Sequence, residues 1–403
     1  MGVYGRILRV PSVFALVVAT VLARMPIGVN GLAALLYVRT ETGSFAAAGL
    51  VVAALALGSA VGAPMQGRLV DRRGRRALVP LAIAHAAGLS AIWLLGELGA
   101  GTVLLASAAL LAGAALPPVA SVLRACWPEL LRERPELIQI AFALDSVLIE
   151  VIFFAGPLLT AAIAAILAPQ FALGVSAACV LGGTVAFVAR LKVDEPAGEA
   201  PRGLLGALAS PGIRTIVVVT LPVGFLLGSI EVALPAFSAE AGDPEIAGVL
   251  LALWSLGSGV AGLAYGAIPR RHSLARTHVA FAVLLPLACA PLALAGSPLV
   301  MAGLVLLAGA PLAPLIASRN EVVSMVAPTA ATTEAFTWPL TALVAGISLG
   351  AATAGTIVEW SGWEPAVLAA AGIAAIGAAI LLARARTLIP RAERRELAAQ
   401  GRL

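Results

Sequence analysis

Twelve long apolar runs constrain this chain more than any other feature of its sequence. Each run is rich in Ala, Leu, Val and Gly, and charged residues or Pro and Gly separate it from the next. A bilayer offers no partners to backbone polar groups, so an apolar run of about 20 residues is typical of a membrane-spanning helix. The predicted spans are 12–38, 46–66, 77–97, 102–123, 138–165, 171–190, 213–237, 246–268, 277–296, 298–318, 334–357 and 365–384.

The composition of the chain excludes a water-soluble fold. Hydrophobic residues make up 61% of the 403 residues and charged residues only 12%, whereas roughly a quarter of an average soluble domain is charged. Arg6 and Arg9 precede the first run, as in a signal peptide. That run is too long for a signal peptide and contains Arg24 and Pro26, so we expect a retained helix. The predicted fold class is therefore an all-α integral membrane protein.

The basic residues predict the orientation of the spans. Of the 26 Lys and Arg residues, Arg39 alone lies in a loop on the side opposite the N-terminus, and Arg24 lies inside the first span. Short loops rich in Lys and Arg stay in the cytoplasm. We therefore expect a multi-pass protein of the plasma membrane with both termini in the cytoplasm. The net charge of +5 reflects this topology and indicates no nucleic-acid partner.

No pattern in the sequence indicates an enzyme or a metal site. Cys126, Cys179 and Cys289 are odd in number and have no CxxC spacing, and the three histidines form no HExxH. The sequence GxxxxGK[ST], which ATP-driven pumps carry, is not present. We expect no catalytic activity, no cofactor and no bound metal.

The second half of the chain repeats the first. Residues 48–67 align without gaps onto 247–266 at an offset of 199, with eight of the twenty positions identical. Two further matches keep nearly this offset, 113–124 with 309–319 and 141–142 with 335–336. Prolines at 117–118 and at 311 and 314 predict bends in spans 4 and 10.

This repeat predicts two pseudo-symmetric six-helix bundles. The expected parts are an N-terminal bundle at 1–191, a cytoplasmic linker at 192–212, a C-terminal bundle at 213–384 and a basic cytoplasmic tail at 385–403. Transporters built from such parallel repeats bind their substrate near the middle of the membrane between the halves.

The loop between spans 2 and 3 carries the segment GRLVDRRGRR at 67–76, with five arginines and one aspartate in ten positions. It resembles the signature G-x-L-x-D-R-x-G-R-R of the major facilitator superfamily. Twelve spans, cytoplasmic ends and the place of the loop agree with that resemblance, which implies a secondary transporter that works by alternating access. Gly156-Pro157 in span 5 also resembles the core of a motif of proton-coupled antiporters, although Ile152 stands in place of its upstream glycine.

The resemblance implies that this loop is a conformational gate. Glycine permits close approach of helices, and an aspartate can pair with arginine or cap a helix N-terminus in one of two states. The equivalent loop of the second half, 269–276, keeps basic residues and has no acid, so an asymmetric latch is expected. The predicted gate residues are Gly67, Asp71, Arg72, Gly74, Arg75 and Arg76.

Four ionisable residues stand out inside the predicted spans, because an ionisable group at bilayer depth costs about 2.5–3.5 kcal/mol on insertion scales. Arg24 and Glu150 are expected near the middle of the membrane, Asp145 nearer the cytoplasm and Glu231 in the outer half of span 7. We expect Arg24 to pair with Glu150. A carboxylate there can alternate between an ion pair and a protonated form, as proton coupling requires, or the pair can be a permanent structural bridge.

The resemblance adds one polar candidate and a preferred function. Spans 1, 4, 7 and 10 line the cavity in this superfamily, which favours Asn30, whereas His85 in span 3 is expected to be a packing residue. The expected function is proton-coupled efflux of a small, fairly apolar compound by a monomer, with protons and the lipid bilayer as its other partners. The alternatives are a proton-coupled importer of a small polar nutrient and a membrane sensor or receptor that transports nothing.

Overall fold

The structure, a computed structural model, describes residues 3–10, 13–192, 206–243, 246–270 and 272–389. These residues form α-helices and short 3-10 turns, and they contain no β-strand. Residues 193–205 of the predicted linker and the tail from 390 onward lie outside the described residues. The predicted all-α fold class is confirmed.

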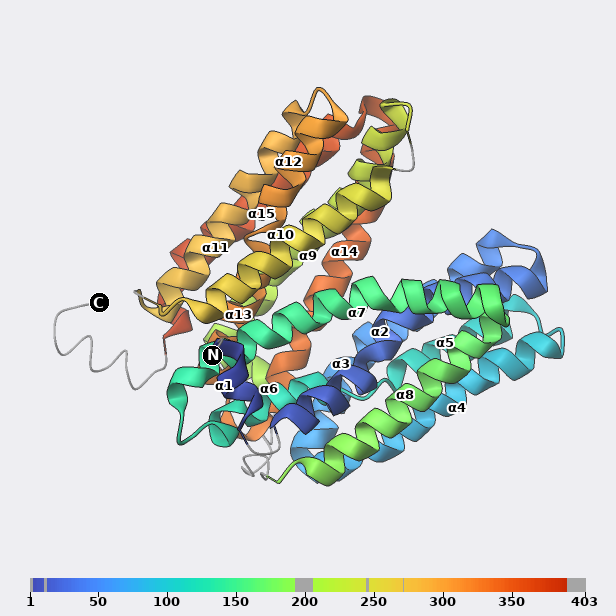
Figure 1. Cartoon of the computed structure of the whole chain (residues 1–403), viewed down its shortest axis with the longest axis horizontal. Coiled ribbons are helices and arrows are strands. Elements are labelled where there is room, and N and C mark those ends of the chain that lie inside the picture. The colour runs from blue at the N-terminus through green and yellow to red at the C-terminus, as the bar shows by residue number, and fades with distance from the viewer. Residues whose placement is uncertain (1–2, 11–12, 193–205, 244–245, 271, 390–403) are drawn as a thin grey trace. The chain divides into compact units, whose positions relative to one another are not determined.

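The described residues contain twelve segments that are long and apolar enough to cross a membrane, as the sequence predicts. After the short helix α1 (Val3–Leu8), the helices are α2 (Val13–Thr42), α3 (Phe45–Arg73), α4 (Leu78–Glu97), α5 (Thr102–Ala114), α6 (Val119–Leu130), α7 (Ile138–Ile166), α8 (Pro169–Arg190), α9 (Pro211–Glu240), α10 (Ile246–Ala267), α11 (Leu274–Cys289), α12 (Pro298–Gly309), α13 (Leu312–Val326), α14 (Thr332–Ser361) and α15 (Trp363–Ala383) (Figure 1).

Two of the spans are broken helices. The fourth consists of α5 and α6, which are interrupted before Val119, and the tenth consists of α12 and α13, which are interrupted before Leu312. Proline removes a backbone donor and clashes with the preceding turn, so a helix breaks there unless neighbours satisfy the freed carbonyls. The bends predicted from the prolines at 117–118 and 311 are confirmed, whereas α13 continues through Pro314.

The tenth span is longer than its hydropathy predicts. The expected span ends at residue 318, whereas α13 continues to Val326. The added turns contain Arg319, Asn320 and Glu321, which are all buried. The prediction was wrong here because charged residues usually end an apolar span, whereas in the folded chain Glu321 accepts from Arg270 and Arg319 donates to Asn320.

Contacts divide the chain into two compact units. Unit 1 comprises Met1–Arg132, Leu148–Gly206 and Thr329–Thr337, and unit 2 comprises Glu133–Val147, Ala207–Pro328 and Trp338–Leu403. The first turns of α7 thus belong to unit 2 and the first turns of α14 to unit 1. Within unit 1, α2 packs on α8 and α3 on α5, and within unit 2, α9 packs on α15 and α10 on α12 (Figure 1).

Glycines set the close packing inside each unit. A Cβ added at Gly58 or Gly62 of α3 would overlap backbone atoms of α5, and one added at Gly113 of α5 would overlap the backbone of α3. Lipid gives no hydrophobic drive for helix association, so small residues that let backbones approach supply the packing energy instead. Gly257 and Gly309 form the same kind of contact between α10 and α12 in unit 2.

Candidate functional site

Asp71, near the end of α3, caps the N-terminus of α14. Its Oδ1 accepts a hydrogen bond from the backbone N–H of Thr333 at 2.9 Å, and its Oδ2 accepts one from the N–H of Glu334 at 2.8 Å. These groups lie in the first turn of α14, where the helix leaves its own donors unsatisfied and its dipole favours a negative charge. The aspartate of the charged loop thus holds the start of a helix from the second half of the chain.

An ion pair lies beside this cap. Arg68 donates from Nε to Oε2 of Glu334 at 3.1 Å and from Nη2 to Oε1 at 2.8 Å. The Glu334 side chain is only 1% exposed, against 31% for Arg68. A Cβ at Gly67 would lie 2.8 Å from Cα of Glu334, so a glycine is needed for α3 and α14 to approach this closely.

The other predicted gate residues follow Asp71 in the chain. Gly74 follows α3 with φ +73, a left-handed conformation that favours glycine, and its N–H donates to the carbonyl of Val70 at 2.7 Å. Arg72 and Arg76 are exposed, and Arg75 is half-buried. The sequence prediction did not include Arg68 or Glu334. An acidic residue at the first position of the eleventh apolar run was the available signal for Glu334.

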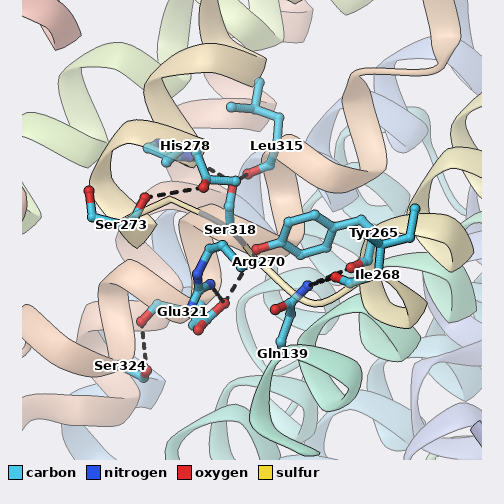
Figure 2. A network of polar contacts seen from close by, with 11 residues as sticks. Gln139, Tyr265, Ile268, Arg270, Ser273, His278, Leu315, Ser318, Glu321 and Ser324 are labelled. Carbon is cyan, nitrogen blue, oxygen red and sulfur yellow. Dashed lines mark hydrogen bonds and ion pairs between the residues drawn. The ribbon is translucent and has the colours of Figure 1, made fainter. Parts of the chain in front are cut away.

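A second polar contact lies in unit 2, at the loop related to the first by the repeat. At the offset of 199, Asp71 corresponds to Arg270, which follows α10. Arg270 Nη1 donates to Oε2 of Glu321 on α13 at 2.8 Å, and the Tyr265 hydroxyl donates to the same oxygen at 3.4 Å (Figure 2). The acid that this loop lacks is therefore supplied by α13.

The hydrogen bond with Glu321 favours the charged form of Arg270. Burial lowers the pKa of the Arg270 guanidinium and the hydrogen bond with Glu321 raises it, and the net direction is upward. The side chains are 24% and 8% exposed. An ion pair so far withdrawn from solvent is screened less than a surface pair.

Gln139, in the first turn of α7, completes the second contact. Its Nε2 donates to the carbonyl of Tyr265 at 2.5 Å and to that of Ile268 at 3.0 Å, at the end of α10 (Figure 2). Because 141–142 match 335–336, Gln139 corresponds to Thr333. The two contacts thus lie at positions related by the repeat, but the side chain accepts hydrogen bonds in one and donates them in the other. In the first, a carboxylate accepts from a helix start, and in the second, an amide donates to a helix end.

Arg24 and Glu150 lie on neighbouring helices of unit 1. Arg24 in α2 is buried, and Glu150 in α7 is half-buried. A Cβ at Gly28 would overlap the carbonyl of Ile152, which fixes the register of α2 against α7. At 1.5 Å per residue, Arg24 lies about 6 Å before Gly28 along its helix and Glu150 about 3 Å before Ile152. The two charged residues are therefore at similar heights.

Gly156 of the predicted Gly156-Pro157 pair is a packing residue. A Cβ at Gly156 would lie 2.6 Å from Cα of Gly28, and a Cβ at Gly28 would lie 3.2 Å from Cα of Gly156. The helix α7 continues through Pro157 to Ile166. Unit 2 contains a similar glycine contact between α14 and α9. A Cβ added at Gly346 would lie 3.0 Å from Cα of Gly224.

The remaining charged candidates are placed differently. Asp145 is buried in the part of α7 that belongs to unit 2, whereas Arg24 and Glu150 belong to unit 1. Glu231 is exposed on α9. The structure thus distributes the four predicted ionisable residues over both units and brings only Arg24 and Glu150 to neighbouring helices of one unit.

Asn30 lies in a buried polar cluster with His85. The His85 Nδ1 lies 2.7 Å from the carbonyl of Ala112, and its Nε2 lies 3.2 Å from Nδ2 of Asn30. Ser176 donates to Oδ1 of Asn30 at 2.5 Å. A carbonyl only accepts, so the proton of His85 is on Nδ1 and Nε2 accepts from the amide. The cluster satisfies its own donors and acceptors inside unit 1.

Replacing His85 by Ala is expected to destabilise unit 1. The change leaves the buried Asn30 amide nitrogen without its His85 partner and removes one of the hydrogen bonds accepted by the Ala112 carbonyl, at a cost of about 1–3 kcal/mol. The measurement is the thermal unfolding midpoint of the purified protein, followed by tryptophan fluorescence. The matched control is His272→Ala, because His272 is exposed. Equal midpoints for the two variants would contradict a structural role for the cluster.

A small cavity lies among α9, α11, α13 and α15 in unit 2. Its lining is apolar except for Thr220, His278 and Arg319, and its volume is about 20 Å³. This is room for about one water molecule. The His278 Nδ1 is 3.0 Å from the Ser318 hydroxyl, which donates to the carbonyl of Leu315 at 3.1 Å (Figure 2). The cavity is too small to be a substrate site.

The first half of the chain is similar to one protein family. Residues 16–213 match the model described as Major Facilitator Superfamily. An uncharacterized MFS-type transporter, y4rN, of Sinorhizobium fredii (strain NBRC 101917 / NGR234) is 25% identical over 276 residues, which cover 65% of this chain and 68% of that protein.

Solved structures share the whole fold at low sequence identity. A bacterial homologue of the iron transporter ferroportin, in an outward-facing state, has a TM-score of 0.76 at 16% identity and covers 93% of this chain and 99% of its own. The transporter FucP in an outward conformation has a TM-score of 0.71 at 15% identity, with 94% and 99% covered. The human organic anion transporter MFSD10 (TETRAN) has a TM-score of 0.70 at 16% identity, with 94% and 100% covered.

Proposed function

Because this chain belongs to the Major Facilitator Superfamily, we propose that it is a secondary active transporter that exports a small, fairly apolar compound by alternating access. Protons moving down their gradient drive the export, and the protein works as a monomer in the plasma membrane. Both termini lie in the cytoplasm, in agreement with the distribution of Lys and Arg between the loops.

The pair of contacts related by the repeat carries this proposal. Each joins a helix from the first half of the chain to one from the second, α3 to α14 through Asp71 and α7 to α10 through Gln139. In a transporter whose halves rock about a central site, such contacts form in one state and break in the other. Both lie at loops rich in arginine, which are expected on the cytoplasmic side.

The proposed coupling pair is Arg24 and Glu150. A carboxylate at membrane depth is costly unless it is paired or protonated, so its two forms can be exchanged by a nearby arginine. The similar heights of Arg24 and Glu150 on packed helices support this pairing. Proton uptake by Glu150 would release Arg24 and change the packing of α2 against α7.

Export is favoured over import by the low polarity of the spans expected to line the cavity. The resemblance of Gly156-Pro157 to the antiporter motif points the same way. The structural neighbours include an organic anion transporter and a homologue of an iron transporter, so the shared fold does not select a cargo.

The test is transport by the purified chain in proteoliposomes with an imposed pH gradient, screened over a compound panel. We expect the wild type to move at least one apolar compound against its concentration gradient. Glu150→Gln, which cannot ionise, should abolish the dependence on the pH gradient. The control, Glu359→Gln, changes an exposed glutamate of α14 and should transport normally. An unchanged pH dependence in Glu150→Gln would remove the coupling role, and accumulation in the opposite direction would identify an importer.

A further inference from the structure

The end of the predicted linker lies on the ion pair of Arg68 and Glu334. Gly206 has φ +46, a left-handed conformation that favours glycine. A Cβ added there would overlap both carboxylate oxygens of Glu334 and would lie 2.6 Å from Nη2 of Arg68. The linker backbone therefore covers this ion pair directly and helps to exclude water from the Glu334 side chain, which is only 1% exposed.

The other end of the same segment is fixed to α13. The 3-10 turn Gly206–Ala209 leads into α9, and Ser210 caps that helix by accepting from the N–H of Ile213 at 3.5 Å. The Ser210 hydroxyl donates to the carbonyl of Val326, at the end of α13, at 2.8 Å. The same helix carries Glu321, the acid of the second polar contact. One short segment thus touches the ion pair of the first contact and the helix that supplies the acid of the second.

The start of α9 has little room to shift against α13. A Cβ added at Gly212 would lie 2.8 Å from the carbonyl oxygen of Thr387 and 2.8 Å from Cγ2 of Val326. The Thr387 hydroxyl also donates to the Thr215 hydroxyl at 2.9 Å, one turn further along α9. These contacts make the Ser210 end of the segment a firm anchor.

The chain between the two anchor points is short. The contact of Gly206 with Glu334 lies within unit 1 and that of Ser210 with Val326 within unit 2, so only the covalent chain joins them. Four residues in a 3-10 turn rise about 8 Å in total, and four fully extended residues reach about 14 Å. A movement that separates the anchor points by more than about 6 Å must therefore break one of the two contacts.

We propose that residues 206–210 are a strap that couples the two polar contacts, because they cover the ion pair of Arg68 and Glu334 and hold the end of α13. Loss of either anchor loosens the other through the chain, since a coupling between two sites acts equally in both directions. The proposal rests on the proposed function, in which these contacts form in one state of the transporter and break in the other.

The test measures maleimide labelling of single cysteines in the purified full chain, in a background in which Cys126, Cys179 and Cys289 are alanine. Thr333→Cys reports on the first contact and Val323→Cys on α13. The side chains at these two positions are 1% and 0% exposed, so each cysteine reacts only when its surroundings open.

Gly206→Ala is expected to raise the labelling rate of Thr333→Cys about tenfold and that of Val323→Cys at least threefold. Its Cβ displaces the paired side chains, and its strained backbone moves the strap. The matched control is Gly99→Ala, also in unit 1. Gly99 has φ +68, but nothing lies within 4 Å of a Cβ added there, so the control carries the same backbone strain without the contact. It should change neither rate.

An insertion of Gly-Ser-Gly between Ala209 and Ser210 separates local effects from coupled ones. Three residues add about 10 Å of slack. With this insertion, Gly206→Ala should still raise the labelling rate at the first contact but no longer the rate in α13. The same insertion after residue 199 lies before the strap and should leave the coupling intact.

Ser210→Ala tests the strap from its other end. It removes the hydrogen bond to Val326 and should raise the labelling rate of Val323→Cys directly and that of Thr333→Cys through the chain. The matched control is Ser297→Ala. Ser297 caps α12 by accepting from the N–H of Val300 at 3.4 Å, so this variant loses the same kind of cap away from the strap. Ser210→Ala decides the question alone if Gly206→Ala does not fold.

Two results would overturn the proposal. One is an unchanged labelling rate of both cysteines in Gly206→Ala and in Ser210→Ala. The other is a rise confined in each variant to the nearer cysteine while the linker has its native length. Neither measurement needs a substrate or a pH gradient, so these results leave the proposed transport untouched. Absence of transport by the wild type, with the coupled labelling intact, would instead reject the transport function and keep the strap.

Discussion

Asp71→Asn is expected to make a cysteine placed at Thr333 react with maleimide about tenfold faster and to slow transport. Asparagine keeps one acceptor oxygen, but its NH₂ group then faces the second backbone N–H of α14, and the negative charge at the helix start is lost. An N-cap contributes about 0.5–2 kcal/mol, and a tenfold change in population corresponds to about 1.4 kcal/mol. Thr333 is 1% exposed and takes part through its backbone, so a cysteine there preserves the contact.

The labelling is measured in a background in which Cys126, Cys179 and Cys289 are alanine. The control substitution is Asp243→Asn, because Asp243 is an exposed aspartate in the loop after α9. It should leave both labelling and transport unchanged. If Asp71→Asn leaves the rate of maleimide labelling of Thr333→Cys unchanged, the cap does not hold α14. The gate must then depend on other contacts, such as the pair of Arg68 and Glu334.

Gly156→Leu is expected to prevent correct folding of unit 1. The Cβ alone would lie 2.5 Å from the carbonyl carbon and 2.6 Å from Cα of Gly28, and backbone atoms cannot give way as a flexible side chain can. Overpacking by a methylene or two costs about 1–3 kcal/mol, which is the expected loss for Gly156→Ala. A leucine adds three further carbons, so α2 and α7 must separate. The yield of monodisperse protein after size-exclusion chromatography and the unfolding midpoint measure both variants.

The matched control for this substitution is Gly182→Leu. Gly182 lies in α8 of the same unit, and nothing lies within 4 Å of a Cβ added there. The control should purify and unfold as the wild type does. If Gly156→Leu behaves like Gly182→Leu, the close contact of α2 with α7 is not needed for the fold, and the similar heights of Arg24 and Glu150 lose their support.

The polar partners of the gate could not be predicted, because they come from distant parts of the chain. Glu334 lies 266 positions from Arg68, and Gln139 lies 126 positions from Tyr265. Glu321 lies outside the predicted tenth span, because a run of charged residues normally ends an apolar segment. Only the packing of α13 shows that Arg270 neutralises it. The sequence predicts separate roles for Asn30 and His85, whereas in the structure the two side chains are hydrogen-bonded to each other.

The sequence by itself determined the helical membrane fold, the twelve spans and the repeat of the two halves. Each depends on local properties, the length of apolar runs and the spacing of glycine and proline, that the bilayer converts directly into helices. The tertiary structure decided which helix start Asp71 caps, which acid serves Arg270 and which backbone Gly156 touches. These depend on how helices far apart in sequence approach within a few ångström, and only the packing of the folded chain sets that distance.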